Sequence, residues 1–152
     1  MTAKRKRTVS QPLIRILFLI YTGIMIWLLF VQRMDAVITN KTENINLVPF
    51  ETLKLYWGLL SSGSSYYFRL AVINLVGNVV MFIPFGVFVP QIWPTCRKFL
   101  LFLLWAVLVI ISIEVLQYIT GLGSCDIDDF ILNFPGMLLG YIISLRLPAF
   151  RR

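Results

Sequence analysis

The sequence predicts an all-α fold: an integral membrane bundle of four transmembrane helices, with the N-terminus and the C-terminus both cytoplasmic. Of its 152 residues, 59% are hydrophobic and 14% are charged, whereas soluble domains are roughly 45–50% apolar and about 25% charged. The apolar residues also gather into four long runs, and most basic residues stand near the ends of these runs. This composition excludes a soluble globular domain, a disordered chain and a disulfide-rich secreted module.

Each apolar run has the length, about 17–25 residues, that crosses a bilayer. The predicted spans are residues 13–31, 70–89, 99–119 and 130–147. The first run follows a basic tail, residues 1–12, but it is longer than the apolar region of a signal peptide and no small-residue cleavage site follows it. We therefore expect a retained anchor there, and an outer loop over residues 32–69.

The distribution of lysine and arginine predicts the orientation. Ten of these residues fall on segments that share a side with the N-terminus, and four fall on the opposite side. Because cytoplasmic segments are enriched in basic residues, we expect both termini in the cytoplasm. The net charge of +7 does not indicate nucleic-acid binding, because the membrane spans separate the basic clusters from one another.

The residue types that are absent or scarce restrict the chemistry. The chain has no histidine, which excludes Ser-His-Asp triads and histidine-based zinc sites. Its two cysteines, Cys96 and Cys125, are predicted to lie on opposite sides of the bilayer, so they cannot form a disulfide.

Polar side chains recur on three predicted helices, each time near the outer end. A charged residue at the centre of a span costs about 2.5–3.5 kcal/mol and is by default a functional candidate. On each helix the polar residues follow a spacing of three or four residues, which places them on one face. The predicted polar cluster contains Asn78, Glu114, Gln117, Asp126, Asp129 and Asn133.

Structural roles are the alternative for these residues. Asp126 followed by Asp129 fits a helix N-cap with an acid in the first turn, and asparagines can form hydrogen bonds between helices. Glu114 needs a partner, for which the candidates are Asn78, Gln117, Arg69 or a bound cation. We assign four further residues to helix packing, because small residues and a tolerated proline are typical of membrane helix contacts: Pro84, Gly86, Gly136 and Gly140.

We expect no cofactor, although the carboxylates leave a divalent cation open. Oxygen ligands would suit Mg²⁺ or Ca²⁺, while raised pKa values, with a proton shared between carboxyl groups, would satisfy the same electrostatics.

Several strings of residues share their order and spacing with a known family. They are Asn46-Leu47-Val48-Pro49-Phe50, Asn78-x3-Phe82-x-Pro84-x-Gly86, Glu114-x2-Gln117 and Asp126-x2-Asp129-x3-Asn133-x2-Gly136. Over residues 46–141 the chain resembles the VanZ-like family. The resemblance implies a single membrane domain over residues 1–152 in a bacterial plasma membrane, associated with glycopeptide (teicoplanin) resistance.

Two classes of function follow from the residues and the resemblance together. The first is a non-catalytic envelope protein whose partners are the lipid bilayer and a lipid-linked cell-wall precursor or the glycopeptide, with no nucleic acid. The alternative is a membrane enzyme that acts on such a precursor with carboxylates and a metal or water. A transporter is a weaker third option, because four spans are few and no inverted repeat is visible. The oligomeric state stays open.

Overall fold

The computed structural model describes residues 10–31 and 45–147, and this part of the chain is predominantly helical. Residues 1–9 of the predicted basic tail and residues 32–44 of the predicted outer loop lie outside it. The α-helices are α1 (Gln11–Ile26), α2 (Glu51–Leu60), α3 (Ser65–Ile92), α4 (Phe99–Thr120) and α5 (Ile127–Arg146). Shorter elements are the π-helical η1 (Trp27–Val31), the 3₁₀ turn η3 (Pro94–Arg97) and the two-residue strands β1 (Ile45–Asn46) and β2 (Cys125–Asp126).

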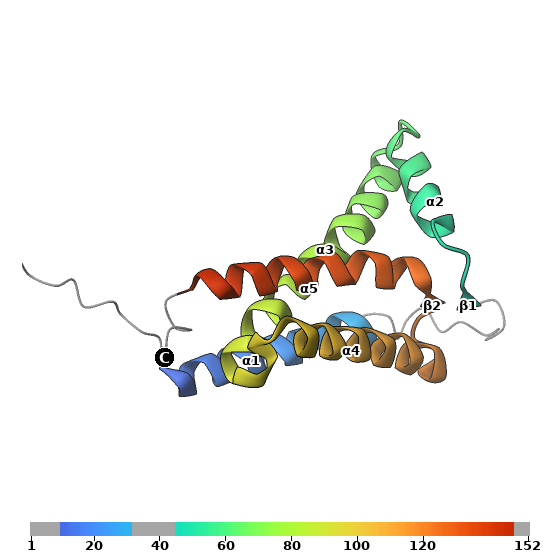
Figure 1. Ribbon diagram of the computed structural model, residues 1–152. Coiled ribbons are helices and arrows are strands. Elements are labelled where there is room, and N and C mark those ends of the chain that lie inside the picture. The colour runs from blue at the N-terminus through green and yellow to red at the C-terminus, as the bar shows by residue number, and fades with distance from the viewer. Residues whose placement is uncertain (1–9, 32–44, 148–152) are drawn as a thin grey trace, which may run out of the picture.

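Four helical segments are long and apolar enough to cross a membrane, which confirms the predicted fold class. They cover Gln11–Val31, Ser65–Ile92, Phe99–Thr120 and Ile127–Arg146. In Figure 1, α1 begins and α5 ends at the left end of the bundle, whereas α4 ends and α5 begins at the right end, beside β1 and β2. The structure does not test which of these two ends faces the cytoplasm, so the orientation stays a prediction.

Within the predicted outer loop over residues 32–69, the described part from residue 45 onward is largely helical, which the sequence did not predict. After Pro49, Phe50 takes a left-handed conformation with φ 68°, and α2 begins at Glu51, an acidic residue that favours a helix N-terminus. A tight turn with Gly63 at φ 74° then leads into α3, which begins before the apolar run does. In Figure 1, α2 and the start of α3 form a helical hairpin that projects away from α4 and α5.

The closest helix contact joins α3 to α5 through three glycines. A Cβ on Gly136 would collide with the carbonyl oxygen of Val79, and one on Gly140 with that of Ile83. From the other side, a Cβ on Gly86 would collide with the carbonyl oxygen of Met137. Glycine lets two helix backbones approach closely, so these residues fix the position of α5 against α3.

Pro84 lies inside α3 and cannot donate to the carbonyl of Val80 four residues earlier. Next to that carbonyl, the hydroxyl of Tyr21 in α1 donates to the main-chain oxygen of Met81 at 2.8 Å. This hydrogen bond ties α1 to α3 one residue beyond the carbonyl that Pro84 leaves without its helical donor.

Candidate functional site

The pairing of β1 with β2 brings the segment before α2 beside the connection from α4 to α5. The strands are parallel, with Asn46 opposite Asp126. The carboxylate of Asp126 accepts a hydrogen bond from the Thr52 hydroxyl at 2.6 Å, and a longer one from the Asn46 amide at 3.5 Å. A polar contact thus forms between residues that are more than seventy positions apart.

Asp126 is also the N-cap of α5. Its side chain accepts from the main-chain N–H of Asp128 at 2.9 Å, which confirms the N-cap interpretation of the sequence. Its own main-chain N–H donates to Glu114 in α4 at 3.2 Å. Glu114 is only 5% exposed, and this hydrogen bond supplies a charge-assisted partner for a buried carboxylate.

Asp128 was missed by the sequence analysis, although its side chain is completely buried. One carboxylate oxygen accepts from the main-chain N–H of Phe50 at 2.6 Å, and the other accepts from that of Leu53 at 3.0 Å. These N–H groups lie at the N-terminus of α2, where no intrahelical acceptor exists. Asp128 therefore caps α2 from a different helix, where its negative charge also suits the helix dipole.

Asn78 and Asp129 connect α3 to the first turn of α5. The Asn78 amide donates to Asp129 at 2.8 Å, and Asn78 is 7% exposed. The hydrogen bond fixes which turn of α3 faces the start of α5. The hydrogen bonds around β2 and the start of α5, which lie at the right end of the bundle in Figure 1, thus involve four carboxylates that we call the carboxylate cluster: Glu114, Asp126, Asp128 and Asp129.

Two residues of the predicted polar cluster have other surroundings. The Gln117 amide donates to the main-chain oxygen of Leu29 in η1 at 3.2 Å, so it ties α4 to the end of the first span. Asn133 is 3% exposed, and its amide oxygen has no hydrogen-bond partner within the described part of the chain. Both side chains are buried, but no hydrogen bond joins either to the carboxylate cluster among the described contacts.

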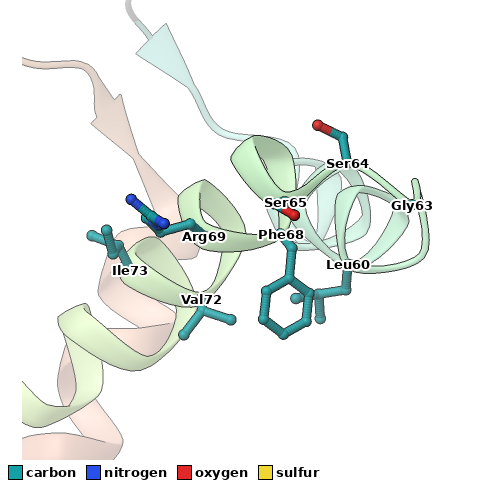
Figure 2. Close-up of a pocket in the computed structure, with 8 residues that line it drawn as sticks. All are labelled: Leu60, Gly63, Ser64, Ser65, Phe68, Arg69, Val72 and Ile73. Atoms are coloured by element: carbon teal, nitrogen blue, oxygen red, sulfur yellow. The ribbon is translucent and has the colours of Figure 1, made fainter.

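Arg69, one candidate partner for Glu114, lies in the hairpin of α2 and α3. It lines a pocket of 470 Å³ with Leu60 and Phe68, beside the turn between these helices (Figure 2). Glu114, for which Arg69 was a candidate partner, accepts from the main-chain N–H of Asp126.

The carboxylate cluster acts on the neighbouring thiol of Cys125. Burial raises the pKa of this thiol, and the nearby charges of Glu114 and Asp126 raise the pKa further. Among residues 10–31 and 45–147, no group of three or more Asp, Glu, Cys or His side chains is arranged to hold a metal ion. In the described structure these carboxylates serve as hydrogen-bond acceptors.

Comparison with known proteins gives one match. A family model described as VanZ/LLP1 matches residues 18–148, which include the whole carboxylate cluster and most of the four candidate spans. The match confirms the resemblance that the motifs indicate. No curated protein and no solved structure matches the chain.

Proposed function

Because the chain belongs to the VanZ/LLP1 family, we propose that it is a bacterial plasma-membrane protein that lowers sensitivity to teicoplanin-type glycopeptides. The carboxylate cluster at the outer end of the bundle is the site that acts. The observation that supports this proposal is the convergence of α3, α4, α5 and the segment before α2 on four acidic side chains.

The energetics of the cluster support a role beyond packing. Acidic side chains on membrane helices are expensive, and a hydrophobic contact would hold helix ends together without that cost. Asp126 and Asp128 accept hydrogen bonds from the N-terminal end of α2 and so join it to the start of α5. A ligand that contacts either of these two segments therefore also contacts the hydrogen bonds of the carboxylate cluster. The excess of basic residues on the opposite side supports an outer location for this end of the bundle, on the face where glycopeptides act on cell-wall precursors.

The depth of the cluster gives an expectation about drug type. A glycopeptide with a lipid tail is held at the membrane surface, beside the ends of the spans. A glycopeptide without a tail contacts its target from solution and comes less close to a membrane-embedded site. We therefore expect expression of the chain to reduce sensitivity to teicoplanin more than sensitivity to an untailed glycopeptide.

Substitution of the cluster tests the proposal in a sensitive bacterial host. The inhibitory concentration of teicoplanin should rise on expression, and Asp129→Ala and Glu114→Ala should each abolish the rise at an unchanged amount of protein in the membrane. Glu51→Ala is the matched control, because Glu51 is an exposed acid outside the cluster. Full resistance in both cluster variants would show that the carboxylates are only structural and would refute the proposal.

A second measurement separates binding from catalysis. Extracted lipid-linked precursors are compared between cells with and without the chain. The proposal expects the same precursors in both, because the chain acts by binding at the outer face. A new or missing precursor would contradict it and would indicate an enzyme that modifies the precursor.

A further inference from the structure

A cleft of 630 Å³ runs between α1 and α3, on the side of α3 away from its glycine contact with α5. Its volume lies in the range of about 300–1,000 Å³ that is typical of small-molecule sites. The walls include Tyr21 and Ile24 from α1, Leu28 from η1, and Gly77, Asn78 and Pro84 from α3.

The packing of α3 explains why this space stays open. The hydrogen bond from Tyr21 to the Met81 main chain holds α1 against α3 near Pro84. Further toward the carboxylate cluster, Gly77 presents no side chain, and a Cβ built on it would meet no atom within 4 Å. The cleft thus extends along α3 from Pro84 to Gly77 and Asn78.

The cleft opens sideways, where a bilayer surrounds the protein. Both of its walls belong to candidate membrane spans, and two lining side chains, Ile24 and Val80, are 52% and 53% exposed. An empty apolar space would forfeit dispersion contacts on every lining atom, and water gains few hydrogen bonds from apolar walls. The occupant that fits this environment is a hydrocarbon chain.

One end of the cleft is polar and close to negative charge. Asn78 lines it and donates to Asp129, so the cleft ends beside the carboxylate cluster. Negative charge at this end attracts a cationic group and repels a purely anionic headgroup. We propose that the cleft binds one acyl chain of a membrane phospholipid whose headgroup carries an ammonium group, with the chain directed toward Pro84 and the ammonium toward Asp129. This site goes beyond the proposed function and does not depend on it.

Matched photoreactive phospholipids test the site on the full chain in nanodiscs. One probe has an ethanolamine headgroup and the other a glycerol headgroup, and both carry the same diazirine-labelled acyl chain. Mass spectrometry should find more adducts on Ile24 and Val80 than on Leu104, an exposed apolar residue of α4. The ethanolamine probe should give about fivefold more cleft adducts than the glycerol probe, the ratio that corresponds to about 1 kcal/mol.

Two glycine variants distinguish the cleft from the rest of the lipid-facing surface. Gly77→Trp fills the cleft and should reduce the adducts on Ile24 and Val80 at least about fivefold. Gly23→Trp is the matched control, because a Cβ on Gly23 also meets nothing within 4 Å and Gly23 does not line the cleft. It should leave the adducts unchanged.

Asp129→Asn should remove the preference for ethanolamine while the acyl chain still labels the cleft. Adducts that spread equally over the cleft and α4, or that survive Gly77→Trp, would overturn the proposal. Equal labelling by the two headgroups on the unaltered chain would overturn it as well. A chain that leaves drug sensitivity unchanged would refute the proposed function alone, because none of these readouts uses a drug.

Discussion

A single buried carboxylate at position 128 holds the start of α2 against the start of α5. It accepts from two main-chain N–H groups, those of Phe50 and Leu53, and no solvent reaches it. Side-chain caps act within one helix in most proteins, whereas this one acts between two helices. Asp128 therefore stabilises the position of the hairpin of α2 and α3, and not the helical conformation of α5.

The variant Asp128→Asn tests this cap. The amide of asparagine places an N–H₂ group opposite one of the two N–H donors, so we expect the free energy of unfolding to fall by about 2 kcal/mol. Thermal unfolding in detergent, followed by circular dichroism, measures the change. Glu51→Gln, at an exposed position in the first turn of α2, should cost less than about 1 kcal/mol, because it removes only a favourable interaction with the helix dipole. Equal stability of the two variants would contradict the assigned cap.

The thiol of Cys125 reports the charge of the cluster. Burial, Glu114 and Asp126 raise its pKa, and the thiolate is the form that reacts. Near pH 8, maleimide labelling should therefore be slower than for a free cysteine, and it should accelerate as the pH rises. Glu114→Gln removes one negative charge, lowers the pKa and should speed labelling at a fixed pH.

Labelling of Cys125 is measured in a Cys96→Ser background, so that only one thiol reacts. At a pH high enough to ionise the thiol fully, the Glu114→Gln variant and its parent should react at the same rate. A difference that persists there would show altered access and not an altered pKa.

Helical periodicity found part of the site and could not have found the rest. Positions 126, 129 and 133 share a face of α5, and the structure indeed places Asp126 and Asp129 at contacts with other elements. Asp128 does not belong to that face, and its partners are main-chain groups, which leave no side-chain pattern. The sequence contained one local signal for Asp128: three acidic residues lie within four positions, directly after the short connection between the third and fourth predicted spans.

At the scale of elements, the four spans were predictable and the hairpin was not. The spans are long, predominantly apolar runs, and their ends moved by only a few residues. Helix α2 has ten residues, too few to form a stable helix alone. Its stability comes from contacts with α3, with the cap at Asp128 and with β2, of which the last two lie more than seventy residues away in the sequence.

The glycine contact between α3 and α5 gives a test at this scale. Gly140→Ala places a methyl group against the carbonyl of Ile83, which forces the helices apart and should cost about 1–3 kcal/mol of stability. Thermal unfolding in detergent measures the loss. Gly23→Ala, at an open helical position, should be neutral or slightly stabilising. An equal effect of the two variants would contradict the close helix approach.

At the scale of the whole molecule, the two ends of the bundle differ in chemistry. The end at which α4 stops and α5 starts, at the right in Figure 1, is the end whose hydrogen bonds involve the carboxylate cluster. The opposite end contains η3 and the last turn of α5, where Arg97 and Arg146 lie. This polarity agrees with the predicted orientation, which reporter fusions can measure directly.

A fluorescent protein that matures only in the cytoplasm should fluoresce at either terminus of the chain. An epitope inserted after Gly63, in the turn between α2 and α3, should bind antibody added outside intact cells with a permeabilised wall. Gly63 suits the insertion because it is exposed and a Cβ there meets nothing within 4 Å. Fusions that do not fluoresce, together with an epitope that the antibody does not bind from outside, would indicate the opposite orientation.

The pairing of β1 with β2 also determines how late in synthesis the fold of the protein can be completed. The ribosome makes β1, α2 and Asn78 early, but their partners in β2 and α5 follow tens of residues later. Until α5, the last of the described helices, enters the bilayer, the first turn of α2 has no cap and Asn78 has no carboxylate to contact. A nascent chain that stalls before α5 therefore exposes unsatisfied polar groups beside lipid, which costs free energy until α5 arrives.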